Sequence, residues 1–87
     1  MSRVTMYTTN WCGYCHAAKR LLNEQGVDFE ERDLGAEPAF RQRLFDLTGG
    51  WTVPQIMIDE RSIGGYTELR RLVSDGRLDG LLAAQPD

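Results

Sequence analysis

The chain has 87 residues, of which 41% are hydrophobic and 26% are charged, and its formal net charge at pH 7 is -3. We expect one globular domain over residues 1–87, because a chain of this length buries a single modest core. The acidic balance argues against nucleic acid as a partner, and no apolar run approaches the roughly 20 residues of a membrane span.

The first part of the chain predicts a strand, a helix and a second strand. Residues 3–8 alternate and carry β-branched and aromatic side chains, as strands do. From Gly13 onward apolar residues recur four apart, which predicts a helix that Gly26 ends at the C′ position. The segment 27–33, "VDFEERD", then predicts the second strand.

A second helix is predicted after this strand. Pro38 suits its first turn, where the missing N–H costs nothing, and Gly49-Gly50 ends it. One apolar stripe along this helix is expected to face the core and consists of Phe40, Leu44 and Leu47.

The remaining chain predicts a hairpin followed by helices. A third strand lies within 51–59 and a fourth within 61–65. Thr67 is a candidate N-cap for the next helix, and one or two further helical turns follow around Leu78. The order β-α-β-α-β-β-α predicts an α/β fold with a four-stranded mixed sheet, parallel at its start and antiparallel in the hairpin.

Cys12 and Cys15 are the two cysteines of the chain. The N-terminus lacks the apolar core of a signal peptide, so we expect a cytoplasmic protein, and stable disulfides are rare there. A zinc site needs about four ligands, and the chain has only one histidine, so a zinc site within one chain is not expected, whereas one shared between chains stays open. The pair is therefore predicted to be chemical, as Cys-x-x-Cys pairs in β-α-β settings are.

The position of the pair predicts a role for each sulfur. Cys12 falls where the first strand ends and the first helix begins, and free N–H groups and the helix dipole favour a thiolate there. Cys12 is therefore the expected nucleophile. Cys15 lies one helical turn further on and can resolve a mixed disulfide.

Three motifs resemble the dithiol glutaredoxin family, and so does the length of the chain. They are "CGYC" at 12–15 after a strand, "TVP" at 52–54, and "GGY" at 64–66 before a helix. The resemblance implies a thioredoxin-like fold with helices on both faces of the sheet. It also implies a monomeric glutathione-dependent thiol-disulfide oxidoreductase with glutathione as co-substrate and no obligatory metal. Its protein partners would be glutathionylated or disulfide-bonded.

The resemblance also implies a glutathione site. Pro54 would be cis and would hold the backbone of Val53 against Cys12. Residues 52–54, which include Thr52, are called the platform below. The γ-glutamyl carboxylate would bind at the helix N-terminus that follows the glycine pair. The resemblance assigns Gly65, Tyr66 and Thr67 to this helix start. It assigns Arg41 to the glycine carboxylate of glutathione and places Tyr14 beside the glutathione sulfur. His16 and Lys19 are expected on the exposed face of the first helix, with a small effect of Lys19 on the thiolate.

Departures from the family pattern leave alternatives open. Thr9 stands where many glutaredoxins have lysine, and Gly13 where proline is commoner. Motifs without that proline are compatible with a [2Fe–2S] cluster shared by two chains, for which Cys12 would be the ligand. Another reductant, such as mycothiol or a thioredoxin reductase, is a second alternative. Trp11 and Trp51 either contact substrates or cover the protein beneath them.

Overall fold

The computed structural model describes residues 3–9, 12–35 and 37–83. Within these ranges no helix combines the length and the apolar character needed to cross a membrane. The elements in chain order are β1 (Val4–Thr8), α1 (Gly13–Glu24), β2 (Glu30–Asp33), α2 (Phe40–Thr48), β3 (Gln55–Ile58), β4 (Arg61–Gly64), α3 (Tyr66–Ser74) and α4 (Leu78–Ala83).

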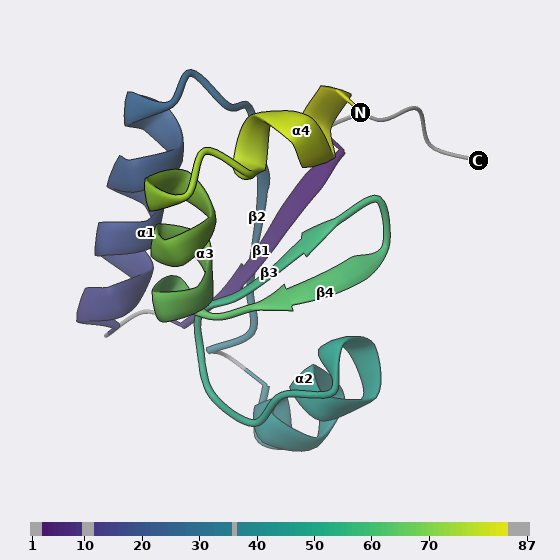
Figure 1. The fold of residues 1–87 in the computed structure, drawn as a ribbon. Helices are drawn as coiled ribbons and strands as arrows, with labels where there is room; N and C mark the ends of the chain where they lie inside the picture. The colour runs from purple at the N-terminus through teal and green to yellow at the C-terminus, as the bar shows by residue number, and fades with distance from the viewer. Residues whose placement is uncertain (1–2, 10–11, 36, 84–87) are drawn as a thin grey trace.

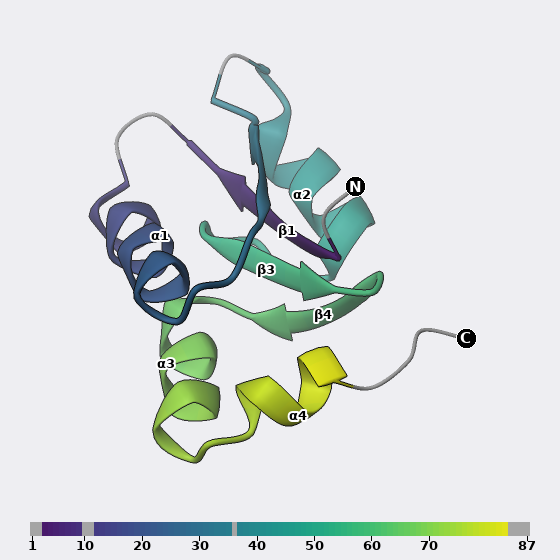
Figure 2. The same cartoon turned by 90° about the horizontal axis from the view of Figure 1, so that it is seen from above.

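The strands form one mixed sheet in the order β2-β1-β3-β4. β1 pairs with β2 in parallel, while β1/β3 and β3/β4 are antiparallel. Helices α1 and α3 lie on one face of the sheet, and α2 covers the other (Figures 1 and 2). The predicted thioredoxin-like fold with a four-stranded mixed sheet is therefore confirmed.

The larger part of the core fills the face under α1 and α3. Alternate residues of β1 and β3 point to this face, as the period of two in a strand requires. The buried cluster consists of Val4, Met6, Ala18, Leu22, Ile56, Ile58, Leu69 and Leu78. Two strands and three helices thus meet at one apolar layer, which fixes α1 over the end of β1.

The opposite face carries a smaller core under α2. Tyr7, Leu34 and Leu44 are buried there. Leu47, which the apolar stripe predicted to face the core, is 40% exposed, so that expectation is wrong. Burial follows the i, i+4 row instead, and after Leu44 this row reaches Thr48, whose hydroxyl donates to the Leu44 carbonyl at 2.8 Å.

Two element boundaries differ from the prediction on the N-terminal side. β2 begins at Glu30, three residues later than expected, and all four of its residues are exposed. Val27 and Phe29 precede the strand and pack against the larger core. Their apolar character reflects that packing and not pairing with β1. Pro38 lies in the turn before α2, whose N-cap is Ala39, so it is not a first-turn residue.

The start of α3 also differs. The N-cap is Gly65, and Thr67 is the second helical residue, so its predicted capping role is wrong. The side chain of Glu68 reaches back instead, and its Oε1 accepts the Gly65 N–H at 2.9 Å. A glutamate at the third helical position can supply this bond because its longer side chain reaches the N-cap backbone.

Candidate active site

Cys12 is the N-cap of α1. Its backbone is extended, with φ -122° and ψ 107°, and its sulfur accepts the N–H of Cys15 at 3.1 Å. The residue is partly exposed. The first turn of α1 also points free backbone N–H groups toward the sulfur. A negative charge on this sulfur is therefore met by backbone donors and remains within reach of a substrate.

Cys15 lies in the first turn of α1 and is only 1% exposed. Burial raises the pKa of the Cys15 thiol to about 12, and the hydrogen bond with Cys12 adds to the rise. Both cysteines are free thiols. The pair therefore combines one accessible sulfur with one shielded, protonated sulfur, which is the arrangement that sequential attack and resolution requires.

The segment 52–54 lies opposite Cys12. The Val53–Pro54 peptide bond is cis, as the resemblance implied. The Cys12 thiol lies 3.6 Å from the Val53 carbonyl oxygen, to which it donates. The side chain of Gln55, which is buried, donates to the Thr52 carbonyl at 2.8 Å and so fixes the loop from inside.

Arg41 reaches the same loop from α2. Its guanidinium donates to the Trp51 carbonyl at 2.9 Å and lies 5.0 Å from the centre of the Phe40 ring. Trp51 is 49% exposed and stacks on Phe45, with ring centres 4.3 Å apart. Trp51 therefore forms part of the surface beside the platform and does not seal the buried core. Trp11 lies outside the described residues.

The glycine pair before α3 packs against the platform. A Cβ on Gly65 would lie 3.2 Å from the Pro54 carbonyl oxygen, and Gly64 has a φ of +104°. Tyr66 is partly buried, and its ring lies 6.0 Å from that of Tyr14, which is 67% exposed. The beginnings of α1 and α3 are thereby brought together around the platform.

Lys19 departs from its predicted exposed position. Its ammonium lies 2.7 Å from the Glu31 carboxylate, and its side chain is 27% exposed. Glu31 also accepts the hydroxyl of Thr8 at 2.7 Å. Sequence reasoning missed this network because only the folded sheet brings β2 under α1; the four-residue spacing of Cys15 and Lys19 was the one available signal. His16 is exposed, as expected.

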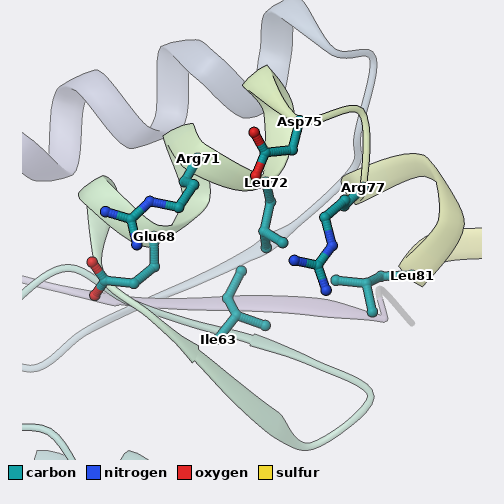
Figure 3. Close-up of a pocket in the computed structure, with 7 residues that line it drawn as sticks. All are labelled: Ile63, Glu68, Arg71, Leu72, Asp75, Arg77 and Leu81. Atoms are coloured by element: carbon teal, nitrogen blue, oxygen red, sulfur yellow. The ribbon is translucent and has the colours of Figure 1, made fainter.

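A separate hollow of about 280 Å³ lies between β4, α3 and α4. Its floor is apolar, and charged side chains surround it; the lining residues are Ile63, Glu68, Arg71, Leu72, Asp75, Arg77 and Leu81. Figure 3 shows the Glu68 carboxylate pointing away from Leu81 toward the beginning of α3. Neither cysteine contributes to this hollow. In the described part of the chain, no group of three or more His, Cys, Asp or Glu side chains could hold a metal ion.

Comparisons with known proteins agree with this geometry. Residues 4–63 match the family model for glutaredoxin. A glutaredoxin from Pseudomonas aeruginosa is 46% identical over 84 residues, covering 97% of this chain and 100% of the relative. The solution structure of a Brucella melitensis glutaredoxin is similar with a TM-score of 0.80 and 40% identity, covering 94% of this chain and 89% of that one. A buckwheat glutaredoxin–glutathione complex is similar with a TM-score of 0.83 and 28% identity, covering 93% and 76%.

Proposed function

Because this chain belongs to the glutaredoxin family, whose members are glutathione-dependent disulfide oxidoreductases, we propose that Cys12 attacks disulfides and Cys15 resolves the product. One observation carries the division of roles. The Cys12 sulfur is partly exposed at the start of α1 and accepts the Cys15 N–H at 3.1 Å, whereas Cys15 is buried. The accessible sulfur at the helix N-terminus is the better nucleophile.

The first reaction removes glutathione from a glutathionylated protein. The Cys12 thiolate attacks the glutathione sulfur, the protein thiolate leaves, and glutathione is joined to Cys12. Free glutathione then attacks this mixed disulfide, which yields oxidised glutathione and restores the Cys12 thiolate. Cys15 takes no part in this cycle, so one sulfur is sufficient for it.

The second reaction reduces a disulfide within or between proteins. The Cys12 thiolate attacks one sulfur and is joined to the substrate. Cys15 then attacks Cys12, which forms the Cys12–Cys15 bond and releases the reduced substrate. Two glutathione molecules later reduce this bond and become oxidised glutathione. The internal resolver is needed because the substrate would otherwise stay attached.

The proposed glutathione site surrounds the Cys12 sulfur. The backbone of Val53 would pair with the extended tripeptide, as an added strand pairs with a sheet edge. The α3 N-terminus would bind the γ-glutamyl carboxylate through its N–H groups. The complete proposed set consists of Tyr14, Arg41, Thr52, Val53, Pro54, Gly65, Tyr66 and Thr67. Glu68 is engaged with the Gly65 N–H, so we assign it a capping role and no direct contact with the ligand.

Arg41 supports the proposal from the other side of the platform. Its guanidinium uses one N–H on the Trp51 carbonyl, and the group carries five N–H donors in all. The bond to Trp51 holds the guanidinium at the loop that precedes the platform. The remaining donors are available for the glycine carboxylate of glutathione, with which a charge-assisted bond would form.

Single-cysteine variants test the proposed roles. Cys12→Ser should abolish turnover on both a glutathione mixed disulfide and a protein disulfide. Cys15→Ser should retain turnover on the mixed disulfide and lose it on the protein disulfide. Retained deglutathionylation by Cys12→Ser would contradict the proposal. The assay should run with glutathione and then with mycothiol or a thioredoxin reductase system, so that the reductant is identified in the same experiment.

The other expectations from the sequence stay predictions. They are the monomeric state, the cytoplasmic location and the choice between an enzyme and a carrier of a [2Fe–2S] cluster. Anaerobic purification with glutathione tests the cluster, because a bound cluster would give a brown protein with visible absorbance. The same preparation run on a calibrated gel-filtration column tests whether two chains associate.

A further inference from the structure

Lys19 is tied to the strand that lies beside the cysteine helix. Its Nζ is 2.7 Å from Oε2 of Glu31, and the same oxygen accepts the Thr8 hydroxyl at 2.7 Å. Thr8 is fully buried at the end of β1, so this contact connects the carboxylate to an inner strand of the sheet. Glu31 thus keeps the Lys19 ammonium on the sheet side of α1 and limits its motion in solvent.

Lys19 and Cys15 share one face of α1. They are four residues apart in the same helix, which places their side chains one turn from each other. Ala18 and Leu22, which are buried with Cys15, define this side of α1 as the side toward the sheet. The partly buried ammonium is therefore a neighbour of the buried thiol.

Cys15 needs such a neighbour because a thiol must lose its proton before it attacks. Burial and the Cys12 thiol raise the pKa of Cys15, whereas the N–H of Thr9 and the charge of Lys19 lower it. Burial raises the pKa of the Glu31 carboxyl, but the hydrogen bonds from Lys19 and Thr8, together with the charges of Lys19 and His16, lower that pKa overall. Glu31 therefore stays charged and paired with Lys19.

We propose that Lys19 is a positioning residue for the resolving step, in which its charge supports the Cys15 thiolate as that thiolate attacks the mixed disulfide on Cys12. The proposal rests on the resolving role given to Cys15 above. The Cys15 thiol first releases its proton to solvent. Its thiolate then attacks Cys12, the Cys12–Cys15 bond forms, and the bond between Cys12 and the substrate breaks. The substrate thiolate leaves with the electron pair and takes a proton from water.

A single-turnover experiment separates the two sulfurs. The uncharged probe dithiodipyridine releases one coloured thiopyridone when Cys12 attacks it and a second when Cys15 resolves the mixed disulfide. In stopped flow, the rate of the first release should rise with probe concentration. The rate of the second should not, because the attack is intramolecular. Both rates should be measured across pH for the wild-type chain and its variants.

Lys19→Met should slow the second release by roughly two- to fivefold near neutral pH, the size expected for a partly exposed charge. It should also move the pH dependence of that release to higher pH, and it should leave the first release unchanged. Lys19→Arg should restore the wild-type profile. Arg32→Met is the matched control, because it removes an ion pair with Glu30 on the same strand, 3.1 Å long, and should change neither release.

Two results would overturn the proposal: an unchanged second release in Lys19→Met, or an equal slowing of both releases. A loosened structure alone would not move the pH dependence of only one step. Cys15→Ser distinguishes this failure from that of the proposed function. If the second release persists without Cys15, the resolving role itself is wrong, whatever Lys19 does.

Discussion

The two cysteines differ in surroundings far more than their three-residue separation suggests. Cys12 is partly exposed and receives a backbone N–H, whereas Cys15 is 1% exposed. Burial is the main reason why the pKa of Cys15 rises from an ordinary value near 9.0 to about 12. Each pKa unit is a factor of ten in the thiolate population, so Cys15 stays protonated at neutral pH.

Selective alkylation follows from this difference. Limiting iodoacetamide at about pH 7 should label Cys12 first, because the thiolate is the reacting species and the Cys15 thiol is buried and protonated. As pH rises toward about 12, labelling of Cys15 should increase, since its raised pKa keeps the proton on below that value. Peptide mass spectrometry measures the order. First labelling of Cys15 at neutral pH would contradict the assignment of the nucleophile.

At the scale of elements, the turn between β4 and α3 is constrained both by its backbone conformation and by its packing. Gly64 has a φ of +104°, and a Cβ added there would lie 2.6 Å from Oε1 of Glu68. That same oxygen accepts the Gly65 N–H. The glycine is therefore required both by its backbone conformation and by the space that the Glu68 cap occupies.

Gly64→Ala should lower the free energy of unfolding by about 1–3 kcal/mol, the range for a residue held in an unfavourable backbone conformation. It should also weaken glutathione handling, because the start of α3 would shift with the displaced Glu68. Urea unfolding and turnover at several glutathione concentrations measure the two effects. Gly80→Ala is the control: it lies inside α4 with open space around it and should stabilise the chain by about 0.5–1 kcal/mol. Equal stability of the Gly64 and Gly80 variants would contradict the argument.

The same turn shows how far the sequence predicts the elements. Alternation predicted β1 and helical spacing predicted the helices, because burial of apolar side chains imposes those periods. Alternation did not predict the position of β2, whose four residues are all exposed. The residues at which the helices and strands begin and end were less predictable. Thr67 has a side chain that could cap a helix. However, the N-cap of α3 is Gly65, two residues before the predicted one, and the Glu68 side chain accepts its N–H. Such choices depend on how the backbone approaches from β4, which no local pattern reports.

The site was predictable to the extent that it is local or carried by a motif. Cys12 at the start of α1 follows from the strand-to-helix transition, and the cis bond at Pro54 follows from the family resemblance. Lys19 was predicted to be exposed because a lysine on a helix surface usually is. Its contact with Glu31 depends on the parallel pairing of β2 with β1, a long-range feature that places Glu31 beside Met6 in the register.

At the scale of the whole molecule, β1 contributes side chains to both hydrophobic cores. Met6 points to the larger core and Tyr7 to the smaller one under α2. The radius of gyration is 12.4 Å, close to the value of about 12 Å expected for one compact domain of this length. We therefore expect the two sides of the sheet to unfold together, as the prediction of one domain requires.

Two optical probes can test this cooperativity. Trp11→Phe leaves Trp51 as the remaining tryptophan of the two in the sequence, and Trp51 reports on the α2 side through its stacking on Phe45. Far-UV circular dichroism reports mainly on the helices of the opposite side. In urea the two signals should change at the same midpoint, because both cores lose packing contacts when β1 unfolds.

Leu44→Ala in this background makes the test decisive. Leu44 is fully buried under α2, and its truncation should lower the free energy of unfolding by about 2–5 kcal/mol. If the molecule is one cooperative unit, the midpoint of the dichroism signal must fall by the same amount as that of Trp51, although the cavity lies on the other side of the sheet. Leu81→Ala, at a residue 41% exposed, should change the free energy of unfolding obtained from either signal by less than about 0.5 kcal/mol. A fall in the Trp51 midpoint alone would show that α2 unfolds separately and would contradict the single-domain prediction.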